Sequence, residues 1–209
     1  MKPLIVPGII AKSQEELDIM LEKVRGKARR IMLDVMDGKF VSNSSLDFDF
    51  QVPAGAFEYE AHLMVDDQIE WIKRNAGKVD IAVMQVEALD DIGEAIRFAR
   101  EQGLGVTLAL NPETELDTVL PYLNEIDAAL ILTVEPGRYG APFVPKTLAK
   151  IRRLREINPW IPIEVDGAMN PKNARLARRA GATIFASGSY VIKSRDPARA
   201  IKELEYAVS

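Results

Sequence analysis

The sequence predicts a single (β/α)8 barrel, the TIM-barrel fold, from three observations. Eight short apolar segments rich in β-forming residues recur along the 209 residues. Most of the segments between them have helical periodicity, with about 25 residues in each repeat, which is typical of this α/β fold. No linker-like segment marks a boundary, so we expect one domain over 1–209; an open doubly wound sheet would need fewer strands or a second domain. The predicted strands are 3–8, 30–36, 58–65, 79–88, 105–111, 127–137, 161–167 and 182–189.

Start and stop signals mark most of the predicted helices. Ser13 precedes acidic and amide residues and then apolar residues at helical spacing, which indicates a helix start. Gly103 and Gly181 follow helical segments at the position where a C-terminal glycine is common. Asn170 and Asp196 each precede a proline, as an N-cap precedes a proline in the first turn. The segments with these patterns are 13–24, 90–103, 144–159, 170–182 and 196–208.

One connection departs from this regular alternation. Residues 42–60, after the second strand, show no sustained helical period, and Pro53 interrupts them. We therefore expect the second helix of the barrel to be short or missing, which leaves seven helices for eight strands.

Composition excludes several classes of protein. The chain has no cysteine, which rules out disulfides, thiolate metal sites and a cysteine nucleophile. The net charge is −4 and no basic stripe is present, so we expect no nucleic-acid partner. No apolar segment approaches the roughly 20 residues that a membrane span needs, and the N-terminus lacks a signal-peptide pattern. We expect a cytoplasmic protein without a membrane partner, in which any imidazole chemistry depends on the single histidine, His62.

Polar residues recur where the predicted strands end. Asp34 interrupts an apolar run, although burying an unpaired charge costs several kcal/mol. In this fold the active site lies at the carboxyl ends of the strands, and side chains alternate between the two faces of each strand. A lone acid there is more often a helix cap, and a lone histidine or methionine more often core, so only the convergence is informative. The converging residues are Asp34, Asp37, His62, Gln85, Glu87, Asn111 and Asp166.

Glycines follow the last three strands of the predicted barrel. Gly167 and Ala168 follow the seventh strand, and Gly188 and Ser189 follow the eighth. Loops at these two places often bind phosphate through backbone N–H groups and a short helix. The loop 137–140, with Gly137 and Gly140, lies after the sixth strand. Ordinary turns would also explain each glycine alone, but their joint placement favours a phosphate site.

Six motifs, LDVMDGKFV, AHLMV, ALNP, TVEPGRYG, EVDGAMNP and ASGS, resemble those of the ribulose-phosphate 3-epimerase family in order and spacing. The resemblance covers about residues 5–205. It implies a metal-assisted isomerase that epimerises C3 of a ketose phosphate such as ribulose 5-phosphate. Asp34 and Asp166 would be the catalytic acids, each serving one face of the substrate. The resemblance also implies an enzyme of carbohydrate metabolism and the pentose phosphate pathway, which we expect to be a homo-oligomer. The residues that it implies to contact the substrate are Met36, His62, Met64, Gly137, Gly140, Gly167, Ala168, Gly188 and Ser189.

The same resemblance implies a divalent metal cofactor, zinc, iron or manganese, with Asp34, His62 and Asp166 as ligands. The family has a further histidine ligand where this chain has Met32. A thioether is a poor ligand for such cations, while three protein ligands with water or substrate still make a catalytic zinc site. We therefore expect the metal to be held more weakly.

Further departures gather at the reacting end of the predicted site. Gln85 replaces a histidine of the family, Leu132 a methionine and Gly8 a serine, and the loop after the second strand is shorter. Arg138 and Tyr139 are additions near the mouth. These changes leave two alternatives open beside an active epimerase. One is a catalytically impaired protein that binds or senses sugar phosphates, and the other is a sister aldolase or isomerase on the same barrel.

Overall fold

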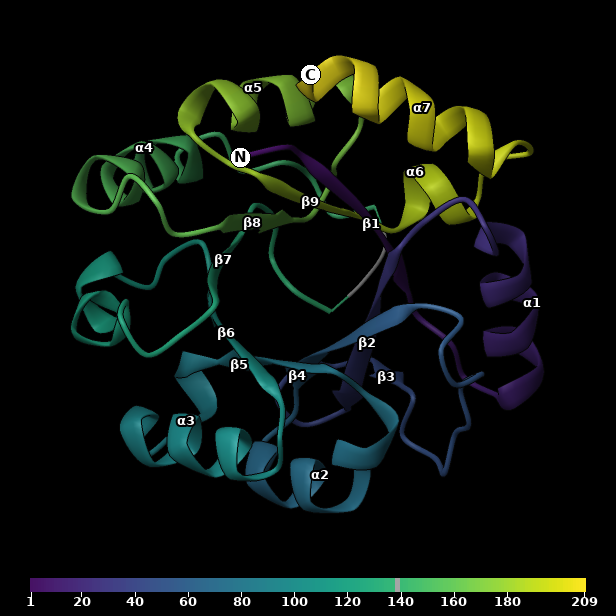
Figure 1. The fold of residues 1–209 in the computed structure, drawn as a ribbon, viewed down its shortest axis with the longest axis horizontal. Coiled ribbons are helices and arrows are strands. Elements are labelled where there is room, and N and C mark those ends of the chain that lie inside the picture. The colour runs from purple at the N-terminus through teal and green to yellow at the C-terminus, as the bar shows by residue number, and fades with distance from the viewer. Residues whose placement is uncertain (138–139) are drawn as a thin grey trace.

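The computed structural model describes residues 1–137 and 140–209, and eight parallel strands form a closed barrel at its centre (Figure 1). The strands are β1 (Leu4–Ile9), β2 (Arg30–Asp37), β4 (Glu58–Met64), β5 (Ile81–Gln85), β6 (Gly105–Leu110), β7 (Ala128–Leu132), β8 (Ile163–Asp166) and β9 (Ile184–Ser187). Each pairs with the next along the chain, and β1 pairs with both β2 and β9, which closes the barrel. The predicted (β/α)8 barrel is thus confirmed.

Helices surround the barrel, and three of them begin at the N-caps that the sequence predicts. The α-helices of eight or more residues among the described residues are α1 (Gln14–Val24), α2 (Gln68–Asn75), α3 (Ile92–Glu101), α4 (Thr147–Ile157), α5 (Pro171–Ala180) and α7 (Pro197–Val208). The predicted caps form: Ser13 accepts a hydrogen bond from the Glu16 amide, and Asn170 and Asp196 act likewise on their helices. A single-turn helix, α6 (Ser189–Ile192), follows β9.

The connection after β2 contains no helix in its described residues, as predicted. It holds the two-residue strand β3 (Ser44–Ser45), which pairs antiparallel with β2. An aromatic cluster covers the barrel wall there instead. The Phe50 ring stacks on Trp71 of α2 with centroids 6.4 Å apart, and Phe48 meets Phe50 edge-on.

The connection after β6 also lacks an α-helix, which differs from the expectation that only the second helix is missing. Two single-turn 3-10 helices, η3 (Leu116–Thr118) and η4 (Leu120–Tyr122), stand in its place. Pro121 has no backbone N–H and is tolerated only in the first turn of a helix, so it divides this segment into short pieces.

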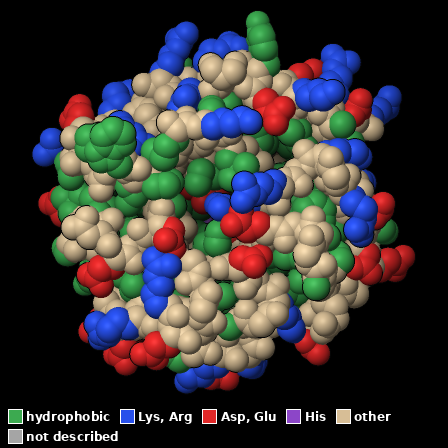
Figure 2. Space-filling view, in the orientation of Figure 1, with side chains coloured by type: hydrophobic (Ala, Val, Ile, Leu, Met, Phe, Trp, Pro, Cys, Tyr) green, Lys and Arg blue, Asp and Glu red, His purple; other side chains and the backbone are tan. Residues whose placement is uncertain are grey.

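Two separate apolar layers stabilise the barrel. The larger one lies between the strands and the helices, and the smaller one fills the barrel interior around Val6, Met32, Val83 and Leu130. Met32 is fully buried in this inner layer. On the face shown in Figure 2, acidic and basic side chains are interspersed rather than gathered by sign. In the described part of the chain, no helix is long and apolar enough to cross a membrane.

Candidate active site

Asp34, His62 and Asp166 meet at the carboxyl ends of three strands. Asp34 and His62 are direct neighbours across β2 and β4, and Asp166 comes from β8 on another part of the barrel wall. The His62 Nδ1 atom lies 3.3 Å from Asp34 Oδ1 and 3.8 Å from Asp166 Oδ2. His62 is fully buried, whereas 19% of the Asp166 side chain is exposed. The three residues that the sequence predicts as metal ligands are therefore brought together.

These three side chains could hold a metal ion. One ligand atom from each lies within 4.8 Å of the others. Asp34 Oδ1 and His62 Nδ1 are buried and have no hydrogen-bond partner among the described residues. Buried polar atoms without partners are costly, and carboxylate oxygen with imidazole nitrogen is a common donor set for divalent cations. Met32 belongs to the apolar interior and not to this group.

Burial and neighbouring charges shift the pKa values of Asp166 and His62. Burial, and then the nearby Asp34 carboxylate, raise the pKa of Asp166 to about 7. Burial alone would lower the pKa of His62, but the Asp34 and Asp166 carboxylates outweigh it and raise this pKa above its usual value. Near neutral pH, Asp166 can therefore exist both with and without its proton.

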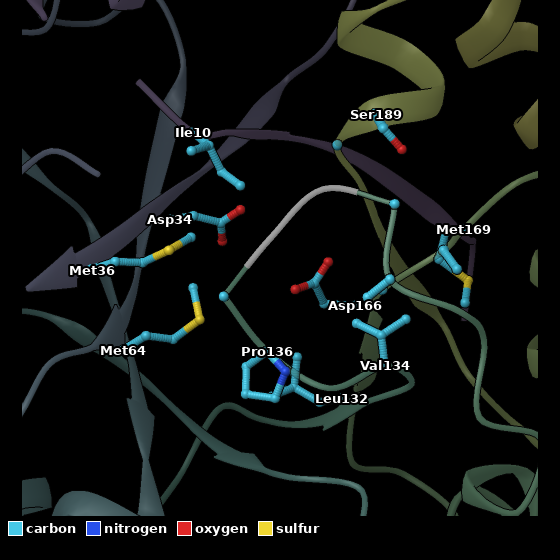
Figure 3. A pocket seen from close by; sticks show the side chains of 16 residues that line it. Ile10, Asp34, Met36, Met64, Leu132, Val134, Pro136, Asp166, Met169 and Ser189 are labelled. Carbon is cyan, nitrogen blue, oxygen red and sulfur yellow. The ribbon is translucent and has the colours of Figure 1, made fainter. Parts of the chain in front are cut away.

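A pocket opens above the two carboxylates. In Figure 3, Asp34 and Asp166 point into it from opposite sides, and Met36 and Met64 lie side by side at one end, away from Ser189. His62 does not line the pocket but lies buried beside the carboxylates. The other predicted site residues do line the pocket. They are Asp34, Met36, Met64, Gly137, Gly140, Asp166, Gly167, Ala168, Gly188 and Ser189.

The loop after β8 has an unusual backbone. Gly167 has φ +112°, and a Cβ there would lie 2.4 Å from the Val134 Cγ2 atom, so only glycine fits. Ala168 also has a positive φ, +53°, which is strained for a residue with a side chain. Such strain is found at ligand sites more often than elsewhere.

Pro136 and Gly137, after β7, also line the pocket. The Asn43 side-chain amide donates to the Gly137 carbonyl over 3.0 Å, and Gly137 packs against Val41. The connection after β2 therefore holds Gly137 in place at the pocket. Arg138 and Tyr139, predicted near the mouth, lie outside the described residues.

Five of the converging polar residues do not line the pocket: besides His62 and Gln85, these are Asp37, Glu87 and Asn111. Both oxygens of Asp37 accept backbone N–H groups, from Lys39, Phe40 and Asp66, so this carboxylate ties the loop after β2 to the end of β4. Although burial opposes it, these hydrogen bonds lower the pKa of Asp37. Glu87 similarly accepts the backbone N–H of Asn111. These residues hold the rim in shape.

Apolar residues that the sequence did not single out complete the pocket. Ile10 could have been predicted from the sequence, because every second side chain of a strand points to the same face and Val6, Gly8 and Ile10 alternate in this way. The others come from loops, where no such periodicity exists. The additional lining residues are Ile10, Val134, Pro136, Ala141 and Met169; Leu132, at the end of β7 and already noted in the sequence, lines the pocket as well.

Comparison with known proteins identifies the family. The model of the ribulose-phosphate 3-epimerase family matches residues 4–192. The chain belongs to this family of carbohydrate epimerases, a class of isomerase. A ribulose-phosphate 3-epimerase of Schizosaccharomyces pombe is 30% identical, with 99% of this chain and 92% of that protein covered. The Bacillus subtilis ribulose-phosphate 3-epimerase is also 30% identical, with 96% and 97% covered.

Solved structures with lower identity share the fold of this epimerase-family chain. A crystal structure of KGPDC from Streptococcus mutans has a TM-score of 0.71 and 16% identity, covering 100% of this chain and 98% of that one. A 3-hexulose-6-phosphate synthase has a TM-score of 0.68 and 19% identity, with 99% and 100% covered. At these identities the likeness concerns the barrel alone.

Proposed function

We propose that this protein epimerises C3 of a ketose phosphate such as ribulose 5-phosphate. The observation that carries the proposal is the pair of carboxylates, Asp34 and Asp166, which enter one pocket from opposite sides (Figure 3). Inversion at a carbon requires that a proton leave one face and arrive at the other. Two acids on opposite sides of the substrate meet that requirement directly.

The roles of the two acids follow from their surroundings. One aspartate takes the C3 proton, and the electron pair of the C–H bond moves toward the ketone to form an enediolate. The other aspartate then donates a proton to C3 from the opposite face. The pKa of about 7 at Asp166 supports its part as the donor in one direction, since its protonated form persists near neutral pH. In the reverse direction the two residues exchange roles.

The metal site fits this chemistry. Asp34, His62 and Asp166 would hold a divalent cation. When bound, it would act as a Lewis acid that stabilises the negative charge developing at the ketone. Met36 and Met64, nearly fully buried, form an apolar wall that excludes water from the reacting carbon.

We place the phosphate of the substrate at the other end of the pocket. Gly167, Ala168, Gly188 and Ser189 line that end, and the backbone N–H groups of such loops can surround an anion. A substrate bound with its phosphate there would reach toward Met36 and Met64, so that its central carbons lie between the carboxylates.

Proton exchange with solvent tests this function. Ribulose 5-phosphate is incubated with the protein in deuterated buffer, with added zinc, iron or manganese or with a chelator. NMR should then show deuterium at C3 together with appearance of the C3 epimer. Ribulose without phosphate is the matched control, and we expect much slower exchange because the phosphate end of the pocket stays empty.

Two results would redirect the proposal. A protein that binds ribulose 5-phosphate but exchanges no C3 proton with any of the metals is a sugar-phosphate-binding protein. Exchange at C1 without epimerisation indicates a sister aldolase or isomerase reaction.

A further inference from the structure

Gln85, at the end of β5, contacts the edge of His62 that faces away from the carboxylates. Both side chains are fully buried, and the Gln85 amide lies 3.1 Å from His62 Nε2. The opposite nitrogen of the ring, Nδ1, faces Asp34 and Asp166. Gln85 is thus the residue that contacts the imidazole on its outer side.

The neighbours of Gln85 determine which way its amide points. Its NH2 group donates to the Ala109 carbonyl over 3.1 Å and to Glu87 Oε2 over 2.9 Å, and both of these oxygens are acceptors. Glu87 is itself held, because its Oε1 accepts from the Asn111 backbone N–H and from the Thr114 hydroxyl. With the NH2 group engaged, the amide oxygen of Gln85 must face His62.

This orientation assigns the proton on the histidine ring. An amide oxygen can only accept a hydrogen bond, so His62 Nε2 must carry hydrogen. In a neutral imidazole the other nitrogen, Nδ1, then has the lone pair, and Nδ1 is the atom between the two aspartates. The backbone of Gln85 is fixed as well, through two hydrogen bonds with the buried Gln68 side chain.

We propose that Gln85 is a positioning residue that keeps the proton of neutral His62 on Nε2, so that Nδ1 is presented to Asp34, Asp166 and a bound cation. The proposal rests on the metal-assisted site proposed above. It gives Gln85 a different task from metal ligation or substrate contact: it selects one tautomer of the only histidine in the chain.

Nitrogen NMR can read this tautomer directly, because one histidine gives one imidazole signal set. The ring nitrogens of 15N-histidine-labelled protein are recorded without metal, at a pH high enough that a neutral imidazole is formed. We expect wild type to show a protonated Nε2 and an unprotonated Nδ1. In Gln85→Met, which has similar volume but no acceptor oxygen, the proton should shift toward Nδ1, where the aspartates accept it.

Two further variants separate positioning from packing. The double variant Gln85→Glu with Glu87→Gln exchanges the acid and the amide, so an acceptor again faces His62, and the Nε2–H form should return. Thr107→Val, a near-isosteric change at another buried polar residue of the barrel, should leave the tautomer unchanged. Zinc affinity, measured by competition with a chelator, should fall about ten- to a hundredfold in Gln85→Met alone.

The proposal is overturned by a wild-type spectrum with the proton on Nδ1, or on both nitrogens up to the pH of unfolding. A Gln85→Met spectrum equal to that of wild type also overturns it. None of these spectra requires turnover. A protein that exchanges no ketose proton yet shows the expected tautomers would contradict the proposed epimerisation and leave the role of Gln85 intact.

Discussion

Two pairs of ionisable side chains lie inside the same barrel, two residues apart along β4 and β8. Asp166 on β8 faces the open pocket beside His62 of β4, while Glu164 and Glu60 lie one step deeper and are fully buried. Neither oxygen of Glu164 has a hydrogen-bond partner among the described residues. Glu60 bonds to Arg30 over 3.1 Å, and Arg30 lies at the amino end of β2.

The difference shows that burial alone does not mark a reactive carboxylate. Burial raises the pKa of both Glu60 and Glu164. Of these four carboxylates, Asp34 and Asp166 line a pocket and lie beside the unpartnered Nδ1 atom of His62, whereas Glu60 and Glu164 do not line it. Access and a partner atom, rather than a shifted pKa, separate a site for chemistry from a buried structural pair.

The largest contrast should appear in activity. Asp34→Asn and Asp166→Asn should each lower the epimerisation rate by about 10²–10⁴-fold, since each removes a proton-transfer group. Glu164→Gln makes the same acid-to-amide change in the fully buried pair Glu60 and Glu164, and it should keep near wild-type activity. Metal content must be measured in each protein, because both aspartates are also proposed ligands. Near-normal turnover in both aspartate variants would show that the two-acid assignment is wrong.

The role of Arg30 beside the buried pair Glu60 and Glu164 can be tested by measuring stability. Arg30→Met removes the cation beside Glu60 and leaves that carboxylate buried without it, which should lower the free energy of unfolding by about 3 kcal/mol. Urea unfolding monitored by circular dichroism measures the change. Arg25→Met, which breaks an exposed ion pair with Glu22, is the control and should have no measurable effect. Equal stability of the two variants would mean that Arg30 does not compensate Glu60.

The pH dependence of stability should reveal Glu164. Burial, and then the Glu60 carboxylate, raise its pKa in the folded protein above the value near 4.5 of an exposed glutamate. The folded state therefore binds the proton more tightly, and this stabilisation is present below about pH 4.5 and lost as pH rises through the folded pKa. Glu164→Gln should be more stable than wild type by about 1–3 kcal/mol at pH 8 and similar to it at pH 4. Urea unfolding at both pH values measures this, and a constant difference between the proteins would contradict the raised pKa.

A smaller effect concerns the metal. Met32→His restores the histidine expected at this position from the family and should raise zinc or iron affinity about tenfold, or about 1.4 kcal/mol. Metal analysis after dialysis reports the change, and Met20→His on α1 controls for an added imidazole elsewhere. If wild type already retains one equivalent against a chelator, Met32 does not weaken the site.

The sequence predicts the barrel and the proximity of Asp34, His62 and Asp166, for physical reasons. Buried parallel strands are continuous apolar runs, and strand parity places Asp34 and His62 on one face. Asp37, three residues after Asp34, shows the limit. It reads as a second acid of the site, but the turn at Gly38 directs its oxygens to backbone N–H groups. The amide orientation of Gln85 is likewise out of reach, because it depends on acceptors that only the folded barrel brings together.

The aromatic cluster in place of the second helix gives the protein a spectroscopic reporter. The chain has two tryptophans: Trp71, which is 7% exposed and stacked on Phe50, and Trp160, which is 83% exposed. A buried indole emits at shorter wavelength than one in water, so the two contributions to fluorescence differ. In Trp160→Phe, emission comes from Trp71 alone and follows the segment that carries Phe50. Because that segment also contacts Gly137 at the pocket through Asn43, a shift in emission on adding a ketose phosphate would report binding at the pocket.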